Sequence, residues 1–101
     1  MTTTTNLEIA NRIADQIGQP AFAMMGTTRK MGDERSLSFD IKGSRWHLCK
    51  VTLELDDTYT VRFYRFPRKG TRMADPVELD RIEASELVRC IEAQTGLYLS
   101  L

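Results

Sequence analysis

The stretch from Trp46 to Phe66, WHLCKVTLELDDTYTVRFYRF, constrains the fold of this chain more than any other. Its apolar residues occupy every second position in two runs, namely Cys49, Val51, Leu53 and Leu55, then Tyr59, Val61 and Phe63. A helix would repeat apolar residues every three or four positions, so the two-residue period predicts two strands, each buried on one face. Residues 56–58, Asp-Asp-Thr, separate the runs and favour a turn, because aspartate side chains bond to nearby backbone N–H groups. The stretch therefore predicts a β-hairpin.

The polar face of this hairpin is a candidate binding surface. It carries Lys50, Thr52, Arg62 and Tyr64, and Trp46 precedes them at the same alternation. An aromatic ring such as Trp46 or Tyr64 on a solvated face leaves apolar area in water, at about 25 cal/mol per Å². We therefore expect a cover, which is a helix of the same chain, a second subunit or a partner. The predicted partner-binding residues are Trp46, Arg62, Tyr64, Arg65, Arg68, Lys69 and Arg72.

Charge is unevenly distributed along the chain, although the formal net charge is zero. Residues 29–72 hold eleven basic and six acidic residues, a net charge of +5, whereas residues 73–101 hold two basic and six acidic residues, a net charge of −4. Residues 60–72 contain five basic residues and no acidic one. Either the basic segment forms a local positive surface, or the acidic C-terminal helix packs beside it and cancels its charge. The sequence leaves both arrangements open.

The length of 101 residues is enough for one domain with its own apolar core. Residues 1–5 are rich in threonine and are expected to be a disordered start, followed by a single domain over residues 6–101. The chain shows no signal-peptide or membrane-spanning pattern, so we expect it in the cytoplasm. Cys49 and Cys90 fall on predicted apolar faces and are expected to be buried free thiols in a reducing compartment.

Two helices are predicted, one toward each end of the chain. The first covers about residues 6–17, where apolar side chains recur at three- and four-residue spacing, and Gly18 and Pro20 are expected to end it. The second covers about residues 84–95, with Gly96 as its cap. An apolar tail over residues 97–101 is expected to dock onto the domain or onto a partner.

Further strands are predicted on both sides of the hairpin. Ala21–Met25 is a short apolar run that predicts a strand, and Gly26–Arg35 predicts a plain loop. Residues 36–42 alternate and predict a half-buried strand, while Thr71–Met73 and residues 77–82 predict strands before the last helix. The predicted fold class is α+β, an antiparallel sheet of four to five strands with an N-terminal and a C-terminal helix.

The chain offers little chemistry for catalysis. His47 and Cys49 are two residues apart, but no further histidine or cysteine cluster completes a metal site, and the spacing does not suit a nucleophile and its base. The loop over residues 26–35, GTTRKMGDER, lacks the spacing and the following helix of a phosphate-binding loop. No catalytic residue, metal site or cofactor is predicted.

Short motifs resemble a family of small uncharacterised proteins of bacteriophages, prophages and plasmids. The run DTYTVRF from Asp57 to Phe63, followed by Arg65 and by Arg68 before Gly70, is similar to the pattern D-x-Y-x-V-x-F-x-R-x-R-G. FAMMG at residues 22–26, SLSF at residues 36–39 and GLYLSL at residues 96–101 match the family in the same order. The chain departs from the pattern by extra residues before Gly70 and by Arg62, where an acidic residue is common. The resemblance implies an origin in a phage or mobile element and supplies no catalytic residue.

Two functions are compatible with these features. The first is a non-enzymatic phage or mobile-element protein that binds a host protein or ribonucleoprotein complex in the bacterial cytoplasm, in its most specific form an anti-CRISPR inhibitor of host defence. The alternative is a single-stranded nucleic-acid binding module whose arginines follow the phosphates while Trp46 or Tyr64 stacks on a base. A net charge of zero favours the first, because nucleic-acid binders usually carry a basic excess. A homo-oligomer is compatible with both.

Overall fold

The alternating stretch forms two paired strands. The computed structural model describes residues 8–43, 46–65 and 76–97. In it, β3 (Leu48–Leu53) and β4 (Tyr59–Tyr64) run antiparallel, with Val51 opposite Val61 and Cys49 opposite Phe63. These four side chains are fully buried, whereas the intervening residues point to the other face. The predicted hairpin is confirmed.

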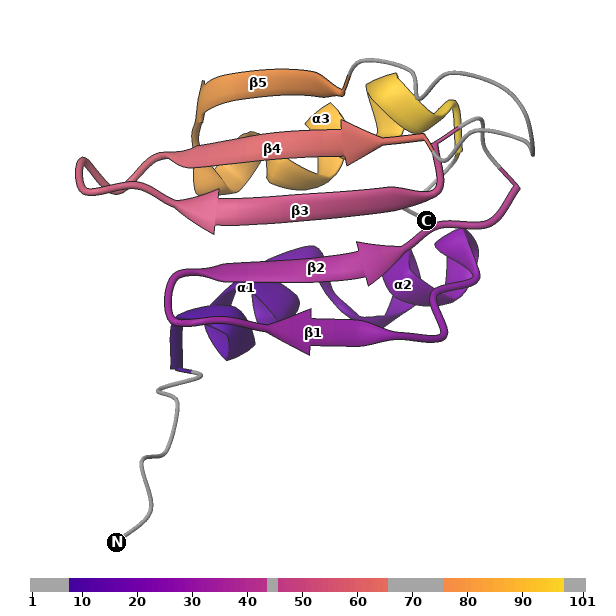
Figure 1. The fold of residues 1–101 in the computed structure, drawn as a ribbon, viewed down its shortest axis with the longest axis horizontal. Coiled ribbons are helices and arrows are strands. Elements are labelled where there is room, and N and C mark those ends of the chain that lie inside the picture. The colour runs from indigo at the N-terminus through magenta and orange to yellow at the C-terminus, as the bar shows by residue number, and fades with distance from the viewer. Residues whose placement is uncertain (1–7, 44–45, 66–75, 98–101) are drawn as a thin grey trace, which may run out of the picture.

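Three more strands extend this hairpin into one sheet. β2 (Ser36–Asp40) pairs with β3, β1 (Lys30–Gly32) pairs with β2, and β5 (Val77–Ile82) pairs with β4, always antiparallel. The strand order β1-β2-β3-β4-β5 therefore follows the chain, and Figure 1 shows the strands side by side. The predicted α+β class, with an antiparallel sheet of four to five strands, is confirmed.

The described helices all lie on one side of the sheet (Figure 1). They are α1 (Glu8–Ile17), α2 (Gln19–Met25) and α3 (Leu87–Thr95), with a short 3₁₀ turn, η1 (Ala84–Glu86), before α3. Their buried side chains include Ile13, Ile17, Phe22, Met25, Leu87 and Ile91. The Phe22 ring meets Phe39 of β2 edge-on, with ring centroids 5.2 Å apart. One face of the sheet thus holds the core, and no described helix covers the other.

Helix α2 replaces a predicted strand. Gly18 closes α1 with a hydrogen bond from its N–H to Ala14 O (2.8 Å), and its φ of 88° turns the chain. Pro20 then stands in the first turn of α2, where its missing N–H leaves no helical bond unmade. Phe22 and Met25, three residues apart, are both buried on the helix side facing the sheet. The prediction of a strand over Ala21–Met25 is therefore wrong.

Strand β1 lies within the predicted loop. Its three residues are all exposed, so they show no alternation that sequence could reveal. The strand forms because it pairs with β2, where Lys30 lies opposite Phe39. The preceding residues Thr28 and Arg29 are held by hydrogen bonds from their N–H groups to Asp40. The prediction of a plain loop over Gly26–Arg35 is wrong for Lys30–Gly32.

The predicted strand before the last helix is confirmed as β5, and both predicted helices are confirmed as α1 and α3, with Gly96 in the left-handed cap (φ 73°). Residues 1–5, Thr71–Met73 and residues 98–101 lie outside the described residues. Within the described ranges, no helix has the length and apolar character that crossing a membrane requires.

Candidate binding surface

The face of the sheet that no described helix covers carries two of the four predicted site residues that the structure describes, Arg62 and Tyr64. Strand register places Ser38 opposite Lys50, Lys50 opposite Arg62 and Arg62 opposite Glu78, and Met31 lies opposite Ser38. Residues opposite one another in an antiparallel sheet point to the same face. We call this surface the open face; Met31, Ser38, Lys50, Arg62 and Glu78 form its central row.

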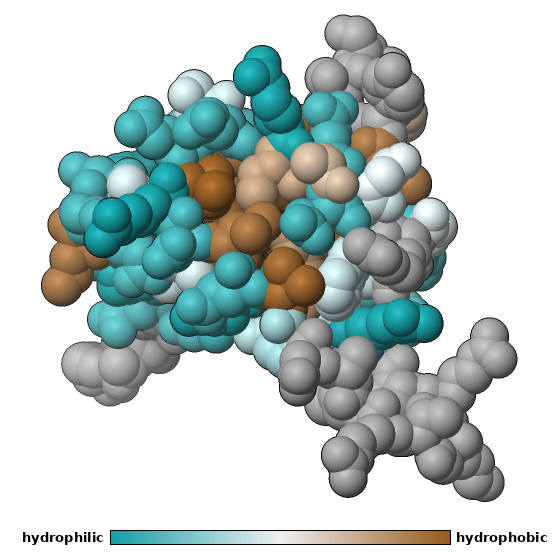
Figure 2. Space-filling view, turned by 90° about the horizontal axis from the view of Figure 1, so that it is seen from above, coloured by the Kyte–Doolittle hydropathy of each residue, from teal (hydrophilic) through white to brown (hydrophobic). Residues whose placement is uncertain are grey.

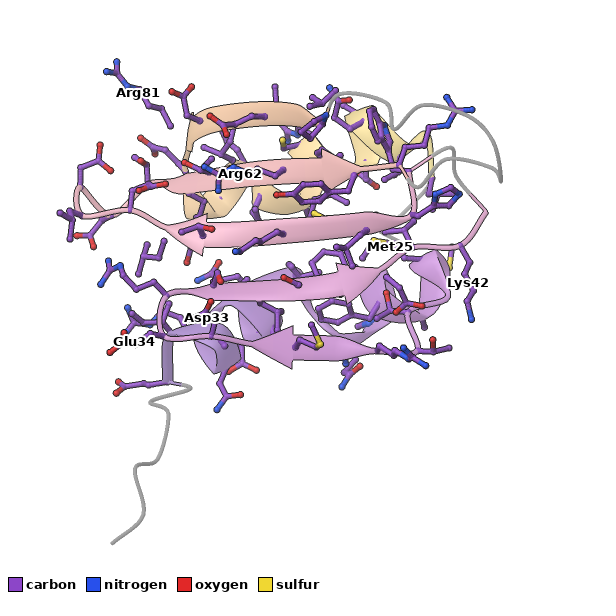
Figure 3. All side chains as sticks on the ribbon, in the orientation of Figure 1. Met25, Asp33, Glu34, Lys42, Arg62 and Arg81 are labelled. Carbon is purple, nitrogen blue, oxygen red and sulfur yellow. The ribbon has the colours of Figure 1, made fainter. Side chains whose placement is uncertain are left out.

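Arg62 on the open face is neutralised by an acid of the next strand. Its Nε lies 2.6 Å from Oε1 of Glu78, and the two side chains are 32% and 55% exposed. Figure 3 shows Arg62 on the face of β4 turned away from the helices. The acid that neutralises Arg62 therefore comes from β5 and not from the C-terminal helix. Arg62 consequently offers little net positive charge to a ligand.

Lys50 and Tyr64 remain available on the open face. Both are half-buried, and Lys50 has no carboxylate of the described residues within 4.0 Å. Tyr64 lies opposite Leu48, which in turn lies opposite Asp40. Arg65 follows β4 and is exposed. The structure thus brings Lys50, Arg62 and Tyr64 onto one surface. Arg68, Lys69 and Arg72 lie outside the described residues.

Trp46 does not lie on the open face. Its side chain is only 7% exposed and packs against Phe63 of the core, with ring centroids 5.9 Å apart. The cause is a one-residue offset before β3: His47 N–H donates to Tyr64 O (2.9 Å), although Leu48 is the residue opposite Tyr64. This offset shifts the alternation and turns Trp46 to the helix side. The expectation of an outward Trp46 is wrong, and its ring is covered by the molecule itself.

An acidic groove lies on the open face beside the β3–β4 turn. It encloses about 470 Å³ and is lined by Glu54, Leu55, Asp56, Thr58, Thr60, Arg62, Glu78, Asp80 and Arg81. Four carboxylates thus face two guanidinium groups, and Figure 3 shows Arg81 extending from the end of β5. Sequence analysis missed this groove, although Glu78 and Asp80 alternate with apolar residues in β5 as a half-buried strand requires.

Hydrogen bonds fix the acids at the turn end of the groove. Thr58 donates to Asp56 Oδ1 from its hydroxyl (2.6 Å) and its N–H (3.1 Å), and these bonds lower the pKa of Asp56. Thr60 donates to Glu54 Oε2 at 2.6 Å. The open face is therefore acidic toward the β3–β4 turn, with Lys50 near its centre.

The described residues place no constellation for bond-making chemistry at this surface. His47 is exposed beside β3, and the described histidine, cysteine and carboxylate side chains form no group of three that could hold a metal ion. Cys49 and Cys90 are free thiols on the helix side, and burial raises the pKa of both. The open face itself presents fixed charges and one aromatic ring, Tyr64.

Comparison with protein-family models, with curated proteins and with solved structures finds no match for this chain.

Proposed function

We propose that this chain is a non-enzymatic protein of phage or mobile-element origin that binds a host protein through the open face of its sheet. The observation that carries the proposal is the central row of the open face, where side chains of every strand stand on a hydrogen-bonded sheet with no described helix above them (Figure 1). An open sheet face of this kind is a broad and rigid platform.

Rigidity supports a binding role for physical reasons. β3 and β4 are each paired on both sides, so the backbone beneath Lys50 and Tyr64 is held in place before any partner arrives. Binding to a preorganised surface loses less conformational entropy than binding to a loop. Tyrosine and arginine are also the side chains that most often anchor protein interfaces. Tyr64 lies on this face, and Arg65 is exposed directly after it in the chain.

The charge of the open face favours a protein over a nucleic acid. A phosphate backbone requires cations that are free to replace its counterions, but Arg62 is held by Glu78. Asp80 and Glu54 lie close by in the acidic groove and would repel phosphate. A protein surface can match both the acids of the groove and Lys50, which no described carboxylate pairs.

The resemblance to phage and mobile-element proteins suggests what kind of host protein is bound. Small proteins of such elements often act by occupying host machinery, including its defence systems. In the most specific form of the proposal, the chain inhibits a bacterial defence nuclease such as a CRISPR effector. This part of the proposal rests on analogy with proteins of the same origin.

The test is capture of a partner with charge-reversed variants. Tagged wild-type protein is incubated with bacterial lysate, the retained protein is identified by mass spectrometry, and its affinity is measured by direct titration with purified components. Lys50→Glu should weaken that affinity about tenfold or more, an order-of-magnitude expectation for a desolvated charge at an interface. Arg89→Glu, an exposed arginine on α3, makes the same kind of change on the helix side and should leave affinity unchanged.

Two results would contradict the proposal. Equal weakening by both variants would mean that the open face is not the contact surface. Tight binding of a labelled single-stranded oligonucleotide, with an affinity that falls steeply as salt rises, would instead support the nucleic-acid function. Thermal melts of all variants show whether a loss of binding reflects a loss of fold.

A further inference from the structure

The outer edge of β5 carries backbone groups that β4 does not use. Glu54 N–H donates to Thr58 O at 2.8 Å, so Thr58 and every second residue after it direct their backbone groups toward β3. Tyr59, Val61 and Phe63 therefore direct their backbone groups toward β5, where Val61 lies opposite Leu79 and Phe63 opposite Val77. The N–H and C=O groups of the intervening Glu78 and Asp80 point away from the sheet. No other strand of the described residues pairs with them, so this edge can accept another strand.

The side of β5 that faces the helices is apolar and incompletely buried. Val77, Leu79 and Ile82 are half-buried, as is Val88 of α3, whereas Val61 and Phe63 of the neighbouring strand are fully buried. In Figure 2, which looks onto this edge from above, an apolar band lies over β5 and α3 between polar surroundings. We call this band the β5 seam, defined by Val77, Leu79, Ile82 and Val88. A strand added to β5 would cover it.

The opposite side of β5 is acidic. Glu78 and Asp80 are exposed on the open face and line the acidic groove together with Glu54 and Asp56. Only Glu78 among the β5 acids is within ion-pair distance of a described base. A strand added at this edge would place alternate side chains next to these acids and the others over the β5 seam.

A second copy of β5 is a poor occupant of this edge. Antiparallel self-pairing that keeps apolar residues on the core side places Glu78 opposite Glu78 or Asp80 of the other copy. Like charges opposite one another destabilise a strand pair. Arg81 also has a φ of 57°, which ends the regular register after Asp80. Charges and irregularities of this kind are how natural sheets prevent edge-to-edge association.

We propose that the β5 edge binds an extended segment of a partner protein in which lysine or arginine alternates with apolar residues, added to the sheet as a sixth strand. The backbone of Glu78 and Asp80 bonds the segment, the basic side chains lie beside the acids, and the apolar side chains cover the β5 seam. This mode of recognition takes affinity from main-chain hydrogen bonds and specificity from alternate side chains. It uses the outer edge of β5, where Glu78 borders the open face, but it does not involve Lys50 and does not depend on the host partner proposed above.

The experiment uses the full chain and three synthetic peptides. The first alternates lysine and valine over about eight residues, enough to span a typical strand. The second replaces lysine with glutamate, and the third keeps the lysine sequence but carries N-methyl groups on every second amide. Binding is measured by titration and by the shifts of backbone amide signals in ¹⁵N-labelled protein.

The lysine peptide should bind and should shift the amide signals of Glu78, Leu79 and Asp80 most. The glutamate peptide should not bind, and the N-methyl peptide should bind at least tenfold more weakly when its methyl groups face β5. Asp80→Asn should weaken the lysine peptide about threefold at low salt, the effect of one cross-strand charge pair. Asp15→Asn, an exposed acid on α1, is the matched control and should leave binding unchanged.

Several outcomes would overturn the inference. They are equal binding of the lysine and N-methyl peptides, no binding of the lysine peptide, or shifts centred on Lys50 and Tyr64. A concentration-dependent dimer whose formation shifts the β5 signals without peptide would assign the edge to a second copy. None of these results bears on capture of a host protein through the open face, so the two proposals fail separately.

Discussion

Asp40 shows how one side chain at the end of β2 holds the segment that leads into β1. Its Oδ1 accepts hydrogen bonds from the backbone N–H groups of Thr28 (2.9 Å) and Arg29 (2.7 Å), and Oδ2 accepts one from the Thr28 hydroxyl (2.8 Å). Burial alone would raise the pKa of Asp40, but the bonds from Arg29 and Thr28 outweigh it and lower the pKa below the usual 3.8. The ionised form is therefore favoured by folding.

Stability should consequently depend on pH through this residue. Because the folded pKa is lowered, the contribution of Asp40 is present above the unfolded value of 3.8 and is lost as the pH falls through the lower folded value. Asp40→Asn should reduce the free energy of unfolding by about 1 kcal/mol at neutral pH, since three bonds to a charged but exposed acceptor become weaker. Urea unfolding measures the difference, which should shrink toward about pH 2.

The exposed Asp15 on α1 provides the control for this measurement. Asp15→Asn should change stability little at either pH. A cost for Asp40→Asn that stayed constant on acidification would mean that the carboxylate charge is not what holds the segment.

Trp46 also shows the limit of sequence reasoning at this scale. Its position continues the outward alternation of Lys50 and Arg62, and nothing in the residues around it announces the offset at His47. The offset depends on which carbonyl of β4 the His47 N–H meets. That is a property of the paired strands, and sequence alone does not contain it.

At the scale of elements, the two glycines that end α2 and α3 differ in how closely neighbouring atoms pack against them. Gly26 and Gly96 cap α2 and α3 in the left-handed region, with φ of 65° and 73°. A Cβ on Gly26 would meet Cβ of Lys42 at 3.2 Å, whereas one on Gly96 would meet no atom within 4 Å. In Figure 3, Lys42 lies beside Met25 at the end of α2. The backbone N–H of Lys42 donates to Met25 O at 2.7 Å.

Gly26→Ala should therefore cost more than Gly96→Ala. Both substitutions force a side chain into a left-handed backbone at about 1 kcal/mol, and Gly26→Ala adds a clash with Lys42 for a total of about 2 kcal/mol. Chemical denaturation of the two variants gives the comparison directly. Equal losses would indicate that Lys42 moves aside without cost.

The elements that the sequence predicted are those with a strong period. β3, β4 and β5 alternate apolar and polar residues, and α1 and α3 repeat apolar residues at helical spacing, so burial and sequence agree. α2 contains only seven residues, and a short apolar run suits a strand and a helix equally. β1 exists because β2 pairs with it, since its own residues bury nothing. The acidic groove likewise arises from strand pairing that brings Glu54 and Asp80 together.

At the scale of the whole molecule, Cys49 reports on the integrity of the core. It lies in the central strand β3 with no exposed surface, and burial, followed by the charge of Cys90, raises the pKa of its thiol well above 9.0. A reagent can reach it only when the sheet and the helices separate. The Cys49 thiol ionises at a lower pH in the unfolded chain than in the folded protein. The free energy of unfolding therefore falls as the pH rises above 9.0.

Thiol labelling should therefore follow global unfolding. In a Cys90→Ala variant, which leaves Cys49 as the single thiol, labelling in native buffer should be slower than in denaturant by on the order of a thousandfold or more. The reciprocal Cys49→Ala variant leaves the half-buried Cys90, which should react much faster. Equal rates for the two variants would mean that the helices open away from the sheet without unfolding of the whole.

The order of the strands along the chain has a consequence for synthesis on the ribosome. Each strand finds its partner in the segment made just before it, so pairing costs only the closure of short loops and can begin while the chain is still emerging. Among the described strands β5 is made after β4, and until β5 emerges, β4 is itself an unprotected edge. A nascent chain stalled at that point would expose to chaperones the same backbone groups that β5 later covers.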